Sequence, residues 1–397
     1  MIRHIIRLMW NQKKRNALII IEMLIVFMVM FFAVYFLSAD LSRLMIPMAV
    51  DSKNVGTIGF YTTDTNTENI RKSFISLKAH LQQLKYVEKV SYSRYSVPFE
   101  DSYSSSDYFY GNKQIQFSLH EADGDYQDLL QIPLLKGRWP LEKESENTPL
   151  PVVITEDAAK TLFGEQNPIG KILSQSNKKK SGKTFVITGI IPIFKQFDYD
   201  RIDAGFFTTF NPLTSTDESS RIMIKIRDGQ KTEFFNSIEK EIFSVVDRDK
   251  WFIWSISTLE DNRITANAAK RTGFYTRAII SSIVIVNILL GFIGVMWYNI
   301  NLRRKEIGLR MAVGSPATTI RWQLITESLV LALFGMIPAL VLILQVFLLK
   351  VFDFESDVFL FSMIFSIITL LLLIILSAWY PGMLASRIKP AIALHSE

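Results

Sequence analysis

The chain has 397 residues, enough for two or three domains, and its hydrophobic content of 49% lies within the range of ordinary soluble proteins. The apolar residues are nevertheless crowded into four blocks, which indicates a membrane protein whose average composition conceals its spans. The formal net charge is +6, and Lys and Arg concentrate beside the apolar blocks. This placement is typical of residues that face lipid headgroups at the ends of membrane spans, and it does not indicate a surface that binds nucleic acid. The absence of cysteine excludes disulfides, zinc–thiolate sites, iron–sulfur clusters and cysteine nucleophiles.

Four segments are long and apolar enough to cross a bilayer, which takes about 20 residues for about 30 Å of hydrocarbon. They are residues 17–38, 277–299, 323–350 and 358–380. The first has too long an apolar core for a signal peptide and no small-residue cleavage site after it. Apolar residues ahead of it recur at helical spacing opposite basic ones, so residues 1–16 are predicted to form an amphipathic helix on the inner leaflet.

Basic residues mark the cytoplasmic side of the membrane. They precede the first span, they follow the second at 303–305, and they recur in the tail at 381–397, whereas the loop at 351–357 is acidic. All of these observations predict one topology, with both termini in the cytoplasm and residues 39–276 outside.

Residues 39–276 have the pattern of a water-exposed α+β domain. A strand, an amphipathic helix and a second strand are predicted within 51–110, and the same order recurs within 218–258. We therefore expect one layer built from two halves that are distant in the chain. Residues 111–217 are richer in turns and predict a β-rich subdomain, with a hairpin tip at 177–183. Residues 259–276 lead to the second span as a stalk.

Motifs for nucleotide or metal chemistry are incomplete. Ser181–Thr184 matches the end of a phosphate-binding loop, but Asn177 stands where its first glycine is needed. We therefore expect no ATP hydrolysis and no cofactor in this chain. The histidines are scattered, which predicts no metal site. Asp123, Asp125 and Asp128 lack the glycine and the distal glutamate of a calcium loop, so a solvated acidic turn is favoured over a calcium site.

The most informative segment follows the second span and reads RRKEIGLRMAVGSP at 303–316. It begins with charges, places Ile307, Met311 and Ala312 at helical spacing, and reaches Gly314 two residues before Pro316, which predicts a short amphipathic helix. Such a helix either lies on lipid or fits into a groove of a partner. On this segment alone, anchoring to lipid is favoured.

This segment resembles the R-x-E-I-G-[IL]-R-x-A-[LV]-G-[AS] signature of the MacB/FtsX-type ABC transporter permeases, the type VII group of the ABC superfamily. Residues 380–394, YPGMLASRIKPAIAL, are similar to the closing motif of that family. Residues 136–191, with KGRW, PVVIT, NPIGK and FVITGII in that order, resemble its MacB-like periplasmic core domain. Met383 and Leu384 depart from the basic residues that are usual there.

The resemblance implies a membrane α-helical fold with four transmembrane helices and a large α+β extracytoplasmic domain between the first two. The halves at 51–110 and 218–258 would be porter-like, and 111–217 a sabre-like insertion. Some members carry an ATPase domain before the first span; only about 16 residues precede it here. The resemblance therefore implies a separate cytoplasmic ABC ATPase subunit that binds ATP and Mg²⁺.

The implied function is that of a permease subunit in the bacterial inner membrane that supports export or efflux by mechanotransmission. The alternative is an FtsX-like scaffold that regulates a cell-envelope hydrolase without transport. Implied partners are a second permease chain, identical or related, and membrane lipids, with a periplasmic adaptor or outer-membrane protein as a further candidate and no nucleic acid. The loop at 300–322 would hold the coupling helix, with these candidate contact residues for the ATPase: Arg304, Glu306, Ile307, Gly308, Arg310, Met311 and Gly314.

Overall fold

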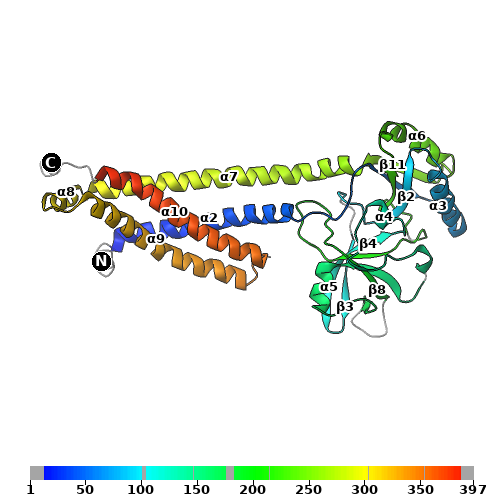
Figure 1. Ribbon diagram of the computed structural model, residues 1–397, viewed down its shortest axis with the longest axis horizontal. Helices are drawn as coiled ribbons and strands as arrows, with labels where there is room; N and C mark the ends of the chain where they lie inside the picture. Colours follow the sequence, from blue (N-terminus) through cyan, green and yellow to red (C-terminus); the bar gives the residue numbers. More distant parts are fainter. Residues whose placement is uncertain are drawn as a thin grey trace. The chain divides into compact units, whose positions relative to one another are not determined.

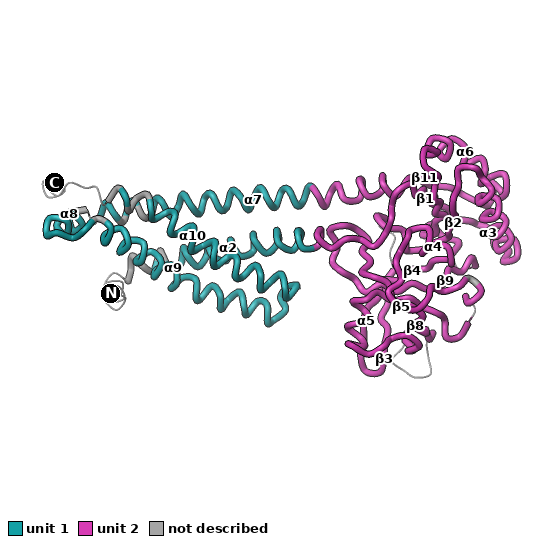
Figure 2. Tube along the Cα trace, in the orientation of Figure 1, with its two compact units in different colours: residues 1–42, 272–397 teal, residues 43–271 magenta. Residues whose placement is uncertain are grey.

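The computed structural model describes residues 13–100, 104–145, 147–175, 183–213, 215–302, 304–352 and 354–385. The chain divides into two compact units, shown in different colours in Figure 2. Unit 1 contains Met1–Ser42 and Thr272–Glu397, and unit 2 contains Arg43–Arg271.

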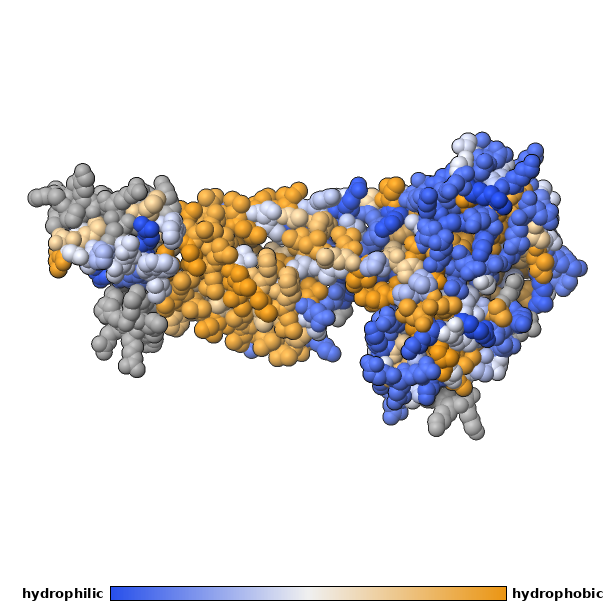
Figure 3. Space-filling view, viewed as in Figure 1, coloured by the Kyte–Doolittle hydropathy of each residue, from blue (hydrophilic) through white to orange (hydrophobic). Residues whose placement is uncertain are grey.

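Unit 1 is helical (Figure 1). Its helices, two of which continue into unit 2, are α2 (Lys13–Met45), α7 (Leu259–Leu302), α8 (Arg304–Ala312), α9 (Ala317–Leu348) and α10 (Ser356–Ala385). All but α8 are long and apolar enough to cross a membrane. Apolar side chains cover most of the face of these helices seen in Figure 3, as expected for a surface in contact with lipid.

Helix α7 combines two predicted elements, because the expected stalk at 259–276 and the second span form one uninterrupted helix. Its 44 residues correspond to a length of about 66 Å at 1.5 Å per residue, twice the hydrocarbon thickness. Helix α2 likewise begins at Lys13 and runs through the predicted boundary at residue 17. Most of the amphipathic helix predicted at 1–16 lies outside the described residues.

The core of unit 1 is formed by α2, α9 and α10, with a smaller contribution from α7. Phe27 and Phe31 of α2, Met336 and Ala339 of α9 and Phe359 of α10 are almost fully buried in it. Small residues line α9 at Ser328, Ala332, Gly335 and Ala339, and such residues let membrane helices approach closely.

Unit 2 contains the two predicted β-α-β segments. The first is β1 (Val55–Thr62), α3 (Thr67–Leu81) and β2 (Val87–Arg94), and the second is β10 (Ser220–Ile226), α6 (Lys231–Phe243) and β11 (Trp251–Thr258). Their strands alternate in the order β11-β1-β10-β2, all antiparallel, which is the arrangement of a split β-α-β fold. The prediction of one layer made from two distant halves is thus confirmed.

Helices α3 and α6 cover one face of this sheet. The side chain of Asn66 caps α3 by accepting hydrogen bonds from the backbone N–H groups of Glu68 and Asn69. Phe74 of α3 and Phe234 of α6 are buried in the shared core, at helical spacing with further apolar residues of each helix. Each half alone would leave an apolar face open, so the two halves stabilise each other.

The inserted subdomain is a closed barrel. Pairing runs in a circle through β3 (Ser104–Tyr110), β4 (Lys113–Ala122), β9 (Gly205–Thr209), β6 (Leu150–Thr155), β8 (Thr184–Ile191) and β7 (Ile172–Ser174), which pairs again with β3. The short β5 (Lys136–Gly137) adds to β8, and α5 (Glu156–Phe163) contributes to the core. Aromatic rings fill the barrel: Tyr108 stacks on Phe206, and Phe117 meets Phe206 edge to face.

One predicted boundary is wrong. The first half was expected to extend to residue 110, but Ser104–Tyr110 is a barrel strand whose Tyr108 lies in the barrel core. The reason is that β3 and β4 form a hairpin, and hairpin partners stay in one sheet. The hairpin tip predicted at 177–183 lies almost entirely outside the described residues, although β7 and β8 on either side of it pair antiparallel.

We expect the substitution Gly335→Ala to destabilise unit 1. A Cβ atom at this position would lie 2.5 Å from Cβ of Met23 and 2.7 Å from the carbonyl oxygen of Ile20, so α2 and α9 must move apart. Overpacking of this kind costs about 1–3 kcal/mol. Thermal unfolding of the purified protein in detergent measures it. The matched control is Gly294→Ala on α7, where no atom lies within 4 Å; equal unfolding temperatures for the two variants would contradict the prediction.

Candidate functional site

The predicted coupling helix is present as α8, and Ile307 fixes it to the rest of unit 1. Ile307 is 4% exposed and packs in one apolar cluster with residues of α7, α9 and α10, namely Ile300, Ile320, Leu324, Ile325 and Ala378. Met311, one turn further on, packs partly against the same cluster. A displacement of α8 must therefore move the ends of the long helices as well, because a close-packed cluster transmits strain.

Polar contacts strengthen this attachment. Arg310 donates hydrogen bonds to Glu306 at 2.6 Å, within α8, and to the side-chain oxygen of Gln323 on α9 at 2.9 Å. Gln323 in turn donates to Glu327 at 3.0 Å. The predicted contact residues Glu306 and Arg310 thus hold α8 against α9 of the same chain.

Gly314 ends the helix. Its φ of +96° lies in the left-handed region, its N–H donates to the carbonyl of Met311, and the N–H of Ser315 donates to the carbonyl of Arg310. This pair of hydrogen bonds defines a Schellman motif, for which glycine is the preferred residue. Gly308 is buried, and Arg304 begins the helix.

The face of α8 available to another protein is formed by residues that sequence reasoning missed. Leu309 is 55% exposed and Val313, at the end of the helix, is 82% exposed. They lie two positions after Ile307 and Met311, which is about 200° around a helix, so they face away from the buried cluster. Leu309 and Val313 are four residues apart, as Ile307 and Met311 are, and this helical spacing could have identified the second apolar face in the sequence.

A second candidate region lies in unit 2, in the segment Lys195–Asp200 that follows β8. Lys195 is 2% exposed, and its ammonium group donates to the carbonyls of Arg43 at 2.7 Å, Ile46 at 2.9 Å and Asp198 at 3.0 Å. Arg43 lies in the last turn of α2 and Ile46 directly follows that helix, where a helix end has unpaired acceptors and attracts cations. Burial lowers the pKa of Lys195, and nearby acidic groups only partly offset this.

The same segment holds the beginning of α7. Asp198 accepts from Arg263 at 2.9 Å and from Asn267 at 2.9 Å, and Asp200 pairs with Lys270. Lys270 also lies over the ring of Phe197, 3.9 Å from its centre. The segment therefore binds the end of α2 and the first three turns of α7, the two helices that connect the outer domain to the spans. We call it the 195–200 segment.

A cavity of about 370 Å³ lies beside this segment and contains His120. The imidazole stacks on Phe207, with 4.4 Å between ring centres, and its Nδ1 is hydrogen-bonded to the carbonyl of Tyr95 at 2.6 Å. Burial lowers the pKa of His120 to about 4, so the ring is neutral at physiological pH. This histidine therefore packs as a neutral ring whose Nδ1–H donates to a backbone carbonyl.

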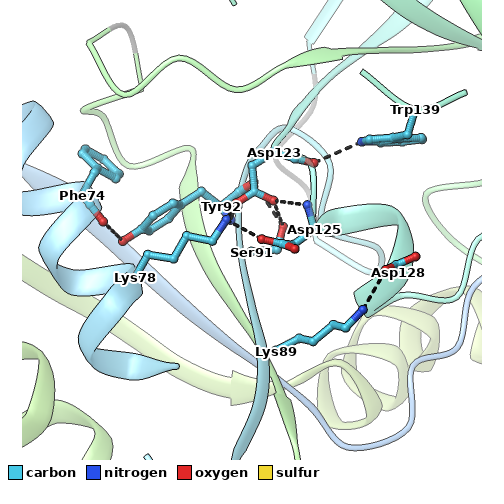
Figure 4. Close-up of polar contacts among 9 residues, drawn as sticks. All are labelled: Phe74, Lys78, Lys89, Ser91, Tyr92, Asp123, Asp125, Asp128 and Trp139. Carbon is cyan, nitrogen blue, oxygen red and sulfur yellow. Dashed lines mark hydrogen bonds and ion pairs between the residues drawn. The ribbon is translucent and has the colours of Figure 1, made fainter. Parts of the chain in front are cut away.

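Within the acidic cluster, Asp123 is buried, whereas Asp125 is partly exposed and Asp128 is exposed (Figure 4). Asp123 is buried and accepts from Ser91 at 2.6 Å, from the N–H of Tyr92 at 2.9 Å and from Lys78 at 2.7 Å. The expectation of a solvated turn is therefore wrong for Asp123, because Lys78 of α3 lies opposite it, a contact that the sequence did not reveal.

The Asp123 network joins the two parts of unit 2. Lys78 also pairs with Asp125 at 2.6 Å, and Trp139 donates to the carbonyl of Asp123 at 3.1 Å. Burial alone would lower the pKa of Lys78, but the carboxylates of Asp123 and Asp125 outweigh it and raise the pKa. Among the described residues, no group of three or more His, Cys, Asp or Glu side chains is placed to hold a metal ion.

Four apolar helices, with a large α+β domain between the first and the second, define a multi-pass membrane protein. The family described as "MacB-like periplasmic core domain" matches residues 20–239, and the family described as "FtsX-like permease C-terminal" matches residues 262–390. The first match covers more than half of the chain. The chain therefore belongs to the MacB-like family of ABC transporter permeases, and the predicted family and fold class are confirmed.

Curated relatives carry the same family name. The macrolide export ATP-binding/permease protein MacB of Mannheimia succiniciproducens is 24% identical over 345 residues, which are 84% of this chain and 51% of the relative. MacB of Aggregatibacter actinomycetemcomitans is 26% identical over 277 residues, which are 66% of this chain and 41% of the relative. The chain thus spans about half the length of the curated relatives it matches, and the matched part is the permease.

Two solved structures are similar to the outer domain. The periplasmic region of MacB from Actinobacillus actinomycetemcomitans has 20% identity and a TM-score of 0.38, over 55% of this chain and 94% of that one. The extracellular domain of YknZ, a noncanonic ABC-type transporter from Gram-positive bacteria, has 15% identity and a TM-score of 0.34, over 50% of this chain and 100% of that one.

We expect Asp123→Ala to destabilise unit 2 by about 3–5 kcal/mol, the usual cost of removing one partner of a buried ion pair. Lys78 would keep only Asp125, and the N–H of Tyr92 would lose its acceptor. Denaturant unfolding of the purified protein measures the loss. The control is Asp128→Ala, which removes an exposed pair with Lys89 and should cost less than about 1 kcal/mol. Similar losses in both variants would contradict a buried, structural role for Asp123.

Proposed function

We propose that this chain is the permease subunit of an ABC transporter, and that it transmits motion between a separate cytoplasmic ATPase and its outer domain. The observation that carries the proposal is the continuity of α7. Near its beginning this helix is bound by Asp198 and Asp200, and near its end Ile300 lies in the cluster that holds α8. One hydrogen-bonded rod therefore connects both candidate regions.

The energy comes from ATP and Mg²⁺ bound by the partner ATPase. Closure of the ATPase displaces α8 through its exposed face at Leu309 and Val313. The buried cluster around Ile307 passes this displacement to α7 and α9. At the other end, the 195–200 segment makes α2 and α7 move together with the barrel, because it is bound to both helices.

In this proposal both termini lie in the cytoplasm, residues 39–276 lie outside, and the protein resides in a bacterial inner membrane. It acts as a dimer with an identical or related chain, surrounded by lipid, and an adaptor or outer-membrane protein would complete an efflux assembly. The fully buried polar side chains of the described spans are mainly serine hydroxyls, such as Ser362, Ser366 and Ser377. Because the interior of the spans is so apolar, we expect the protein to act on a cargo that lies outside the membrane. Macrolides, which appear in the names of the relatives, are the first class of cargo to examine.

We expect Leu309→Glu to abolish binding of the ATPase while the permease remains folded. A carboxylate at the centre of an apolar contact must be desolvated, which costs several kcal/mol. The measurement is co-purification of an ATP-hydrolysing subunit with the tagged chain from native membranes. Ile75→Glu on α3 is the control, because Ile75 is similarly exposed, at 61%, but lies in the outer domain. Should no ATPase co-purify with the unmodified chain, the proposed function itself is wrong.

We expect Lys195→Met to leave the ATPase bound and active but to uncouple the outer domain from it. The variant removes the three hydrogen bonds that the ammonium group donates to the carbonyls of Arg43, Ile46 and Asp198. Since the chain has no cysteine, a spin label at Ser76→Cys reports the distance between outer domains in the dimer. ATP should change this distance in the parent protein and not in Lys195→Met.

Asp64→Asn is the control for this experiment, because Asp64 pairs with Lys250 in the outer domain at 3.2 Å, and neither partner belongs to α2 or α7. An unchanged response to ATP in Lys195→Met would show that the 195–200 segment does not carry the motion. A response to ATP without any movement of cargo in the parent protein would favour the scaffold alternative.

A further inference from the structure

A second cavity in unit 2, of about 550 Å³, lies between the split β-α-β sheet and the beginning of α7. Its lining comes from β10, β11, the first turns of α7 and the segments that follow β2 and precede β10. No described residue lines both this cavity and the one beside His120. Its volume lies within the roughly 300–1,000 Å³ of sites that hold drug-sized ligands, so a small molecule can enter it.

The indole of Trp254 forms one wall of the cavity. The register of β11 against β1 shifts between Gly59 and Phe60, which leaves Trp254 as a bulge without a partner on β1. The indole lies against Gly59, where a Cβ atom would come within 2.6 Å of it, and 4.3 Å separates its ring centre from the guanidinium of Arg221. Trp254 is still 50% exposed. Bulges occur next to active sites because they re-aim a side chain, and this one turns an aromatic ring onto the sheet.

The ring lies on the face of the sheet that α3 and α6 leave open. Phe60 packs on Phe74 of α3, so Gly59, one position earlier, faces the opposite side. Gly59 pairs with Arg221 of β10 as well as with Ser255 of β11, and the absence of a side chain at Gly59 lets the indole cross β1. The cavity therefore has a fixed aromatic wall on an otherwise polar face.

A buried ion pair forms another part of the lining. Arg221 is 3% exposed, and its Nε donates to Glu100 at 2.7 Å. Its Nη1 donates to the carbonyls of Glu218 at 2.6 Å and Ser220 at 2.9 Å. Asn262 of α7 donates to the other carboxylate oxygen of Glu100 at 3.2 Å. The charges of Arg221 and Glu100 thus offset each other inside the protein.

The lining keeps an excess of acceptors. Glu218 is exposed and has no ion-pair partner among the described residues, so the lining carries one negative charge, from Glu100 and Glu218 against Arg221. The amide nitrogen of Asn262 donates to Glu100 and to Thr57, which leaves its oxygen as an acceptor. A ligand that complements these groups must bring positive charge.

We propose that this cavity binds an organic cation, with its charged nitrogen near Glu218 and its apolar part on Trp254. The face of an indole attracts cations and also supplies a large apolar contact area. An anion would meet the excess carboxylate instead, and the lining guanidinium of Arg221 is already bonded to Glu100.

The inference deepens the proposed function and rests on it only for the role of the ligand as cargo. Asn262, Thr265 and Ala266 line the cavity and belong to the first turns of α7, the helix proposed to transmit motion. A displacement of α7 therefore changes the shape of the cavity. Binding itself needs neither ATP nor the ATPase.

The test uses the full chain, purified alone in a neutral detergent, and berberine, a planar quaternary ammonium compound that becomes fluorescent on leaving water. We expect saturable binding of one berberine per chain. Benzyltrimethylammonium should displace it, and benzyl alcohol, which shares the ring but has no charge, should not. A lack of saturable binding, or equal displacement by the two competitors, would overturn the proposal.

Neutralising the unpaired carboxylate should weaken binding. We expect Glu218→Gln to lower the affinity for berberine by about fivefold, the usual effect of losing one partly exposed charge contact. Glu165→Gln is the control, because Glu165 is also exposed but lies after α5 and does not line the cavity. The same affinity in both variants would show that berberine binds elsewhere, for example on the apolar spans, and would contradict the proposal.

A second pair of variants separates binding from folding. Thr265→Arg places a tethered cation in the cavity and should abolish berberine binding. Ile264→Arg adds the same charge to the neighbouring position of α7, which is 70% exposed and does not line the cavity, and should leave binding unchanged. Both positions are exposed, so the two variants should unfold at the same temperature. Equal binding by the two variants would overturn the proposal.

Co-purification of the ATPase separates this inference from the proposed function. If berberine binds with the expected dependence on Glu218 and Thr265 but no ATPase co-purifies, the cation site stands and the proposed function is wrong. If the ATPase co-purifies and berberine does not bind, the proposed function stands and the cation site is wrong.

Discussion

The outer domain is inserted into the membrane part of the chain, so only α2 and α7 connect it to the spans. The buried ammonium group of Lys195, which binds carbonyls at the end of α2, satisfies acceptors that a helix end otherwise leaves to water. Asp198 and Asp200 bind α7 from the same short segment. Because these contacts are buried or charged, the end of α2 and the beginning of α7 are both fixed to the 195–200 segment within unit 2.

At the other candidate region, the two faces of α8 have different surroundings. Ile307 and Met311 attach the helix to its own chain, and Arg310 bonds Gln323 of α9. Leu309 and Val313 remain exposed. The proposed function requires both faces, since contact with an ATPase would have no effect unless the helix were firmly attached to the elements it moves. The family signature spans both faces, and therefore does not by itself separate attachment from contact.

The outer domain combines two ways of dealing with sheet edges. The inserted subdomain closes its sheet into a barrel, which removes edges altogether, and the buried pair of Asp123 and Lys78 joins it to α3. The split β-α-β sheet instead ends at β11, an uncharged strand in which Trp254 forms a bulge against β1.

The sequence by itself determined the number of spans, the helical nature of α8 and its end at Gly314, the two β-α-β halves, and membership of the permease family. These features depend on local patterns: apolar length, helical or alternating periodicity, and a glycine at a positive φ. The tertiary structure alone decided which polar groups meet. Asp123 looked like a solvated turn because Lys78 is 45 residues away in the chain. Lys195 gave no signal because its acceptors are backbone carbonyls, which every residue carries and which only folding brings within reach.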